Sequence, residues 1–406
     1  MKFAMITTFF GQHSFGGDAA YVDRLSRALL KRGHKVDVIY SLDSFNLLHK
    51  EHPIRFYDAP EGLRIYPLHS RIGAFFQLMI HQTGKPCFFK RQLEKLLQDN
   101  EYDVIHFHNI SLIGGPGLFG LNSGSEQTIK IMTTHEHWIL CPLSLLWQYD
   151  RQVCEKKECV RCTIKASRPP QLWRQFTPPL HKLSQLDALI CPSFHTKNLY
   201  TIPSLNIPIY QLPYCLPDEW SNGSDAAKKH FAAWPRPYFA AAGRLVKEKG
   251  FQNLIPVMQH FPYHDLLIAG TGPLKDNLKR MADSFSNVHF LGLLSEDELP
   301  ALFQSAIAVV MPSLFYETFG YVALEAFSVK TPVILNRIGA LPELIDVSGA
   351  GLVYENEAQL FHAMKILAED GNLCSEMGER GWQTWRNNWS EELHLDLYFQ
   401  ILDDLT

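Results

Sequence analysis

The stretch "IAVVMPSLFYETFGYVALEAFSVKTPVILN" (residues 307–336) decides the fold of the second half of the chain. Two short apolar runs, 307–313 and 331–336, flank a segment of helical character at 320–329. Short apolar runs without polar alternation are typical of strands that are covered on both faces, as in a parallel sheet. The stretch therefore predicts a strand, a crossover helix and a second parallel strand.

The same alternation of short apolar runs and helical patterns continues in both directions. Strands are predicted at 2–8, 35–40, 64–69, 103–108, 130–135, 187–193, 238–243, 265–270, 287–292, 307–313, 331–336 and 351–355. Two consecutive α/β units, each doubly wound, place a cleft between the carboxyl ends of their strands. The predicted fold class is therefore α/β with two Rossmann-like domains.

Domain boundaries follow from breaks in this rhythm. "IYQLPYCLPDEW" (209–220) has no helical period, which predicts a linker near 213–217 between a first domain at 1–213 and a second at 217–384. Between 141 and 180 Cys, Lys, Arg and Pro dominate, which predicts an insertion outside the sheet. A final helix at 385–406 is expected to return to the first domain.

Length and charge limit the classes of function. The chain has 406 residues, which suits two domains, and its formal charge of −4 gives no global attraction to nucleic acid. The apolar run at the N-terminus breaks at Gly11, and no stretch reaches about 18 uninterrupted apolar residues. We expect a cytoplasmic protein without a membrane span, with peripheral contact to the inner face of the membrane left open.

Two glutamates, Glu317 and Glu325, stand eight positions apart around Gly320. Residues eight apart in a helix are separated by roughly 12 Å along the axis, whereas paired glycosidase carboxylates lie about 5–9.5 Å apart. Two separate contacts along an extended ligand therefore fit better than a paired acid and base. The backbone N–H groups near Phe319, Gly320 and Tyr321 begin the helix, and its positive end suits a phosphate. A solvated loop residue and a surface helix residue explain the same spacing without a ligand.

A basic loop follows the strand predicted at 238–243. "AAAGRLVKEKGF" (240–251) places Arg244 and Lys249 beyond the carboxyl end of that strand. Arginine supplies bidentate donors and lysine a point charge, and both suit a diphosphate. A solvated basic loop is the simpler alternative.

The first domain carries a matching loop and a histidine. "FFGQHSFGGDAAY" (9–21) places Gly16 and Gly17 between a strand and a helix, where bare backbone can approach a phosphate. The spacing is not GxGxxG, and a flexible turn explains it equally well. His135, in "TTHEHW" (133–138), ends a strand and is better placed than most histidines to contact a ligand.

The motifs taken in order resemble glycosyltransferase family 4, retaining enzymes of the GT-B fold. The resemblance covers nearly the whole chain, is strongest at 238–356, and rests on "FGGDAAYVDRLSRALLKRGHKV", "TTHEHW", "CPS", "GRLVKEKG", "GTGPLKDNLK", "FLGLL", "YETFGYVALEAF" and "GALPELI". It implies two Rossmann-like domains facing across a cleft. The chain departs from the family at 213–215, where "PYC" replaces the expected "PNG".

The resemblance also implies residue roles. Glu317 would contact hydroxyls of the donor sugar, and Glu325 would bind the ribose hydroxyls. Arg244 and Lys249 would neutralise the diphosphate, so no catalytic metal is expected. Further donor contacts are implied for Gly16, Gly17, His135, Ser193, Leu291, Phe319, Gly320 and Tyr321.

The implied reaction is hexosyl transfer with retention from a nucleoside-diphosphate sugar to a hydroxyl of a glycan or lipid-linked acceptor. The expected setting is the synthesis of bacterial surface polysaccharide or glycolipid. The sequence names neither the base, the sugar nor the acceptor. A nucleotide-sugar epimerase on a related scaffold and a non-catalytic nucleotide-binding module are the alternatives, whereas the lack of GxGxxG after any predicted strand speaks against a nicotinamide-dependent dehydrogenase.

Four cysteines of the insertion fall within 22 residues: Cys141, Cys154, Cys159 and Cys162. Four thiols with a final CxxC suit tetrahedral zinc, and similar cysteine-rich insertions occur in a subset of the family. A structural zinc ion is therefore predicted, with an iron–sulfur cluster and unligated thiols as alternatives. A disulfide framework is the weaker interpretation because no secretory signal precedes it.

The segment "RIGAFFQLMIHQTGKPCFFKRQLEKLLQ" (71–98) mixes large apolar residues with Arg and Lys. Such a segment can lie on an anionic membrane and receive a lipid-linked acceptor. Ordinary core-facing helices with lysines that extend to solvent fit the same pattern.

Overall fold

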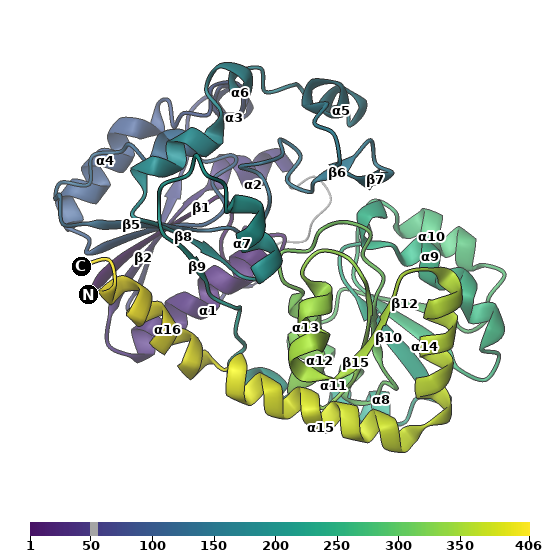
Figure 1. The fold of residues 1–406 in the computed structure, drawn as a ribbon. Coiled ribbons are helices and arrows are strands. Elements are labelled where there is room, and N and C mark those ends of the chain that lie inside the picture. The colour runs from purple at the N-terminus through teal and green to yellow at the C-terminus, as the bar shows by residue number, and fades with distance from the viewer. Residues whose placement is uncertain (49–55) are drawn as a thin grey trace. The chain divides into compact units, whose positions relative to one another are not determined.

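The computed structural model describes residues 1–48 and 56–406 (Figure 1). The chain divides into two compact units. Unit 1 comprises Met1–Tyr149, Glu155–Pro213 and Leu395–Thr406, and unit 2 comprises Asp150–Cys154 and Tyr214–His394. Each unit is built around one parallel sheet with helices on it, as predicted from the alternating pattern.

The sheet of unit 1 has seven strands in the order β3-β2-β1-β4-β5-β8-β9. Its strands are β1 (Lys2–Thr7), β2 (Lys35–Ser41), β3 (Leu63–Leu68), β4 (Val104–Phe107), β5 (Ile129–Thr133), β8 (Ala188–Cys191) and β9 (Ile209–Gln211). All of the pairings are parallel, and Phe3 of β1 lies between Val36 and Val104 of its two neighbours. The strand order reverses at β1, which is typical of a doubly wound fold.

Most helices of unit 1 pack on this sheet and bury its apolar side chains, and two short ones belong to the insertion at 141–180. The helices are α1 (Gly17–Lys31), α2 (Leu42–Leu48), α3 (Gly73–Thr83), α4 (Phe89–Asn100), α5 (Cys159–Lys165), α6 (Trp173–Phe176), α7 (Phe194–Tyr200) and the 3₁₀ turns η1 (Gly115–Leu118) and η2 (Pro179–Gln185). In α1 the buried residues Val22, Leu25 and Leu29 recur every three or four positions, so one face of the helix packs on the sheet.

The sheet of unit 2 has six parallel strands in the order β12-β11-β10-β13-β14-β15. Its strands are β10 (Tyr238–Ala242), β11 (Asp265–Ala269), β12 (Val288–Gly292), β13 (Val309–Met311), β14 (Val333–Asn336) and β15 (Gly351–Tyr354). Its helices are α8 (Asp225–Ala232), α9 (Phe251–Leu254), α10 (Lys275–Ala282), α11 (Glu298–Gln304), α12 (Tyr321–Ser328), α13 (Leu341–Ser348), α14 (Glu357–Glu369) and α15 (Gly371–Asn388), with 3₁₀ turns η3 (Asp218–Ser221), η4 (Lys247–Lys249) and η5 (Ile255–His260). The predicted strand, crossover helix and strand at 307–336 are β13, α12 and β14.

The structure differs from the sequence prediction at two boundaries. The segment 209–220 begins with the edge strand β9, whose three partly buried residues are too few to show a period. The last helix, α16 (Glu391–Asp403), begins after α15 has ended, and only Leu395–Thr406 belongs to unit 1. The insertion at 141–180 lies outside the main sheet and contains the small separate sheet of β6 (Trp147–Gln148) and β7 (Gln152–Val153).

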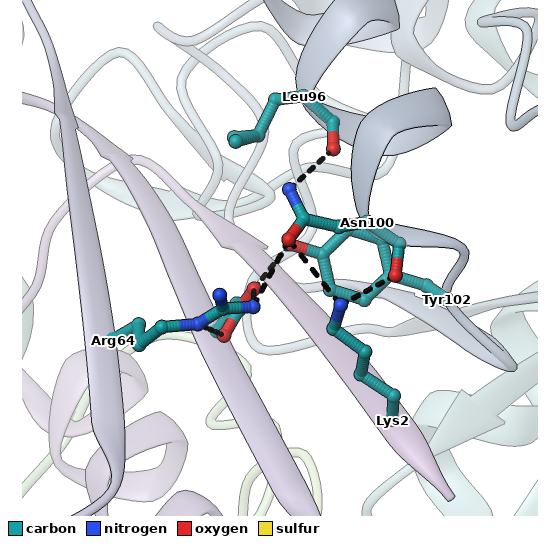
Figure 2. Close-up of polar contacts among 6 residues, drawn as sticks. Lys2, Arg64, Leu96, Asn100 and Tyr102 are labelled. Atoms are coloured by element: carbon teal, nitrogen blue, oxygen red, sulfur yellow. Dashed lines mark hydrogen bonds and ion pairs between the residues drawn. The ribbon is translucent and has the colours of Figure 1, made fainter.

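A buried carboxylate lies at the amino ends of the strands of unit 1. Asp37 of β2 is 1% exposed, and its oxygens accept hydrogen bonds from Arg64 Nε at 2.7 Å, from Arg64 Nη2 and from the Tyr102 hydroxyl. Figure 2 shows that Asn100 links Arg64 to Lys2, with its Oδ1 accepting from Arg64 Nη2 at 3.1 Å and from Lys2 Nζ at 3.2 Å. We call these five residues the Asp37 cluster; its buried charge is fully paired.

Within the described residues, no helix is both long and apolar enough to span a membrane.

Candidate functional site

The loops that follow the strands of unit 2 are joined by backbone hydrogen bonds. Leu245 N donates to Thr271 O at 2.9 Å, which ties the loop after β10 to the loop after β11. Gly270 N donates to Gly292 O at 2.6 Å, which ties the loop after β11 to the end of β12. Because parallel strands end at one edge of the sheet, these loops form a continuous rim there.

The loop after β13 joins the same rim. Leu314 N donates to Glu248 O at 2.7 Å, and Asn336 Nδ2 at the end of β14 donates to Ser313 O at 2.8 Å. Gly250 has φ +75°, and a Cβ on it would lie 1.8 Å from Pro312 O. A glycine is therefore needed where the two loops meet, and this contact sets the position of the neighbouring Lys249.

Lys249 and Glu317 form an ion pair on this rim. Lys249 Nζ lies 2.6 Å from Glu317 Oε1, and Ser313 Oγ donates to the same oxygen at 2.6 Å. The side chains are 26% and 12% exposed, so solvent screens the pair only partly. The Lys249 ammonium also lies 5.3 Å from the centre of the Phe315 ring. Two residues predicted from separate motifs are thus in direct contact.

The N-terminus of α12 follows Glu317 directly. Gly320 precedes the helix with φ +114°, and a Cβ on it would lie 2.8 Å from a methyl carbon of Leu341. Phe319 is buried against the Tyr214 ring at 5.3 Å, and Tyr321 stacks on the same ring at 5.1 Å. These aromatic side chains hold the start of α12 in place, so any ligand contact at Phe319–Tyr321 falls to the backbone amides.

Three further predicted residues of unit 2 lie on or near this rim. Arg244 follows β10 and is exposed. Leu291 lies in β12, one residue before the Gly292 carbonyl that binds the loop after β11. Glu325 lies in the second turn of α12 and is partly buried. Their contacts to a ligand stay predictions.

In unit 1 the two predicted glycines begin α1. Gly16 is the N-cap residue with an extended backbone and Gly17 is the first helical residue, and both are exposed. Asp18 stands in the first turn, and its Oδ2 accepts from Asn109 Nδ2 at 3.0 Å. Because a carboxylate already occupies the positive end of this helix, a phosphate there would meet a like charge.

His135 lies in a chain of histidines. Its Nε2 bonds to His108 Nδ1 over 2.9 Å, and its ring centre lies 4.9 Å from that of Tyr21. The His108 ring in turn lies 4.0 Å from that of His106, which bonds to Tyr398 over 3.0 Å. Burial lowers the pKa of His135 to about 3 and holds the pKa of His108 well below its usual range. Both rings are therefore neutral near pH 7. The alternation of histidines in "DVIHFH" was the signal for the two that sequence reasoning missed.

Glu136, beside His135, is a second residue that sequence reasoning missed. Its Oε1 is buried and has no hydrogen-bond partner among the described residues. Burial, assisted by the charge of Asp18, raises the pKa of this carboxyl to about 7. Ser193, in contrast, caps α7 by accepting a hydrogen bond from Thr196 N at 3.0 Å, and this gives it a structural role.

Within the part of the chain that the structure describes, none of the four cysteines of the insertion forms a disulfide bond. Among the described residues no group of three or more His, Cys, Asp or Glu side chains is placed to hold a metal ion. Cys162 Sγ accepts instead from the backbone of Tyr149 at 3.5 Å. The arrangement therefore does not present the predicted ligand set, and zinc at these thiols stays a prediction.

Comparison with known proteins follows the same division of the chain. The family described as Glycosyltransferase Family 4 matches residues 15–201, and the family described as Glycosyl transferases group 1 matches residues 225–384. The uncharacterized glycosyltransferase MJ1607 of Methanocaldococcus jannaschii is 25% identical over 380 residues, which are 88% of this chain and 86% of that protein. The chain is a glycosyltransferase of the GT-B fold. This confirms the coarse part of the family resemblance, since both halves of the chain match glycosyltransferase families.

Other similar proteins match part of the sequence or the fold. The lipopolysaccharide core biosynthesis glycosyltransferase LpsE of Rhizobium meliloti is 30% identical over 171 residues, 41% of this chain and 49% of that protein. The sucrose-phosphate synthase of Thermosynechococcus elongatus has a TM-score of 0.78 at 19% identity, covering 100% of this chain and 98% of that chain. HepE of Anabaena in complex with UDP-glucose has a TM-score of 0.68 at 14% identity, covering 100% of both chains. The two structural likenesses establish the GT-B fold.

Proposed function

We propose that this glycosyltransferase is a retaining hexosyltransferase that uses a nucleoside-diphosphate sugar. The observation that carries the proposal is the Lys249–Glu317 ion pair beside the N-terminus of α12. A cation and a row of backbone N–H groups suit a diphosphate, and a carboxylate in the same short stretch suits the hydroxyls of the sugar joined to it.

Each group on the rim receives a role in this proposal. Lys249 carries three N–H donors, of which one binds Glu317 Oε1, and the others are assigned to the diphosphate. Arg244, exposed after β10, adds a second cation. Glu317 Oε2 is assigned to the sugar hydroxyls, and Glu325 to the ribose hydroxyls. Because Ser313 also binds Oε1, the carboxylate is held in one orientation before the donor arrives.

The reaction needs no covalent step on the protein. The bond between the sugar's anomeric carbon and the leaving phosphate oxygen breaks, and a bond to the acceptor oxygen forms on the same face. The departing phosphate oxygen takes the acceptor's proton. Positioning and neutralisation of the developing phosphate charge by Arg244 and Lys249 are the contributions asked of the chain. Neutral His135, in unit 1, is assigned to a hydrogen bond with the donor sugar.

Two relatives support the choice of substrates. HepE is described in complex with UDP-glucose, and LpsE is named for lipopolysaccharide core biosynthesis. We therefore propose a glycan or lipid-linked acceptor in the synthesis of bacterial surface polysaccharide or glycolipid.

The proposal is tested with a panel of UDP-, GDP- and ADP-sugars in thermal-shift assays, followed by assays of nucleoside-diphosphate release with candidate acceptors. One base is expected to raise the melting temperature of the wild-type chain, and Glu325→Ala is expected to remove that rise. Lys249→Ala should lower turnover at least 100-fold, whereas Lys247→Ala should not, because Lys247 lies on the same 3₁₀ turn and pairs with Asp150 instead.

Three outcomes contradict the proposal. Equal losses of turnover in the two lysine variants would show that Lys249 has no specific role in catalysis. No shift with any nucleotide sugar would favour a non-catalytic module. Conversion of the donor sugar without an acceptor would identify an epimerase.

Membrane contact through α3 and the start of α4 is a second part of this proposal. Phe75 is 62% exposed, Leu78 46% and Phe88 65%, and Lys90 lies beside them in the sequence. Liposome flotation should recover the wild-type chain on anionic vesicles and lose it after Phe75→Ala and Phe88→Ala together. Tyr263→Ala, which removes an 80% exposed ring of unit 2, is the matched control. Absence of wild-type flotation would refute this contact.

A further inference from the structure

A pocket of about 240 Å³ lies in the insertion, within unit 1. Its lining includes Lys157 and Cys159 near the start of α5, and Gln171, Arg174 and Gln175 in and before α6. Pockets for drug-sized ligands hold about 300–1,000 Å³, so this one suits a group no larger than a single sugar.

The Arg174 guanidinium in this pocket is held in one position. Its Nε donates to Gln171 Oε1, and its Nη1 donates to Ile139 O at 3.2 Å. Its plane lies over the Trp138 ring at 4.3 Å and near the Trp173 ring at 5.3 Å. A guanidinium fixed by two hydrogen bonds and two rings loses little freedom when a ligand binds to it.

Two N–H donors of this pair have no partner. Because Arg174 Nε can only donate, the Gln171 oxygen must face it and the Gln171 amide nitrogen must face away. Gln171 Nε2 and Arg174 Nη2 are both buried without a hydrogen-bond partner among the described residues, and Gln171 is only 5% exposed. A buried donor of this kind is unfavourable unless an acceptor is supplied.

The charge around these donors is positive. Burial lowers the pKa of Arg174 to about 10, so the side chain is still protonated at neutral pH. No carboxylate of the described part of the chain forms an ion pair with it. The acidic groups that it faces are the thiols of Cys141 and Cys159, the Tyr200 hydroxyl and Glu136, whose pKa burial raises to about 7. Exposed Lys157 on the pocket wall adds a second cation.

We propose that this pocket binds the carboxylate or phosphate group of a sugar-sized ligand. Nε and Nη2 share one edge of a guanidinium, so the Gln171 amide that binds Nε lies at the same edge as the unpartnered Nη2. Donors at one edge suit an anion with two or more oxygens. Lys157 supplies further charge at the pocket wall. The site goes beyond the proposed transfer, which uses none of these residues.

The test is isothermal titration calorimetry on the full chain with glucuronate, glucose 1-phosphate, inorganic phosphate and neutral methyl glucoside. At least one anion should bind saturably and methyl glucoside should not. Binding by glucuronate alone would identify a carboxylate ligand, and binding by the two phosphates a phosphate ligand. Arg174→Met and Gln171→Leu should weaken the binding at least tenfold. Gln175→Leu, an exposed glutamine of the same pocket, should leave it unchanged.

A further variant keeps the proposal testable if Arg174→Met or Gln171→Leu does not fold. Gln171→Glu places a carboxylate beside Arg174, so it should raise the melting temperature and abolish anion binding together. The proposal would be overturned if no anion bound to the wild-type chain, or if wild type and Gln171→Leu bound the anions equally well. The proposal would also be overturned if no anion bound and Arg174→Met contained less zinc than the wild type. The counter-charge of Arg174 would then be a metal–thiolate group. Loss of donor binding in unit 2 would leave this test unaffected.

Discussion

Two arginines of unit 1 differ in the partners that surround their guanidinium groups. Arg64 is 49% exposed, yet both of its bonds to Asp37 reach a carboxylate that is only 1% exposed. Arg174 is itself largely buried, and its neighbours are two indole rings, a carbonyl and an amide. The Arg64 guanidinium completes the hydrogen bonds of a buried carboxylate, whereas Arg174 and its neighbour Gln171 keep buried donors that have no acceptor among the described residues. A complete network indicates a role in stability, and an incomplete one indicates a place for a ligand.

The largest expected effect comes from making the same substitution at both arginines. Arg64→Met leaves the buried Asp37 carboxylate without its cation, and breaking such a pair costs about 3–5 kcal/mol. Arg174→Met removes hydrogen bonds to Gln171 and Ile139 but leaves no buried charge without its counter-charge, so its cost should be smaller, about 1–3 kcal/mol. Urea unfolding followed by circular dichroism measures both. Equal losses of stability in the two variants would erase the distinction between the clusters.

The Glu136 carboxyl, in contrast to that of Asp37, accepts no hydrogen bond from an arginine in the described part of the chain. Its pKa is raised to about 7 in the folded chain from 4.5, so the folded state binds the proton more tightly than the unfolded state does. The contribution of this proton to stability is complete below about pH 4.5 and is lost as the pH rises through about 7, a change of at most about 3 kcal/mol. Glu136→Gln should flatten this part of the stability profile.

Unfolding free energies of wild type and Glu136→Gln are compared at pH 5 and pH 8. The wild type should lose more stability than the variant between the two values. A parallel decline in both chains would show that Glu136 does not carry the proton.

The Tyr102 hydroxyl tests how much a single donor to the buried carboxylate contributes. Tyr102→Phe keeps the ring, which is 2% exposed, and removes only the hydrogen bond to Asp37. Hydrogen bonds to charged groups contribute about 1.5–3 kcal/mol, so the loss should be smaller than that of Arg64→Met. Tyr66→Phe on β3 is a matched removal of a tyrosine hydroxyl in the same sheet. A cost equal to that control would place the stability of the cluster in the arginine alone.

The smallest effect is expected at the partly exposed end of the Asp37 cluster. Asn100→Ala removes the amide that links Arg64 and Lys2 (Figure 2). Both cations can reach water instead, so the cost should be about 1 kcal/mol. Nucleotide-sugar binding and anion binding should be unchanged, since neither proposed site uses this residue. A loss above that of Tyr102→Phe would show that the cluster depends on its outer member.

The order of strands and helices was largely predictable because it depends on local patterns. The apolar runs at 307–313 and 331–336 mark β13 and β14, and Gly320 marks the start of α12. β9 was missed because a partly buried strand of three residues leaves no period to read. The four cysteines of the insertion have a spacing that suits a metal, whereas no group of three or more ligands is placed to hold one among the described residues, and zinc there stays a prediction.

The sequence by itself determined the two α/β units and the membership of both halves in glycosyltransferase families, because periodicity and motif order are local properties. Only the tertiary structure decided which charges meet. Lys249 and Glu317 are 68 positions apart and come together because the loops of parallel strands end at one rim. Arg174 had no sequence signal at all, since the lack of a partner for a buried donor is defined by everything that packs around it.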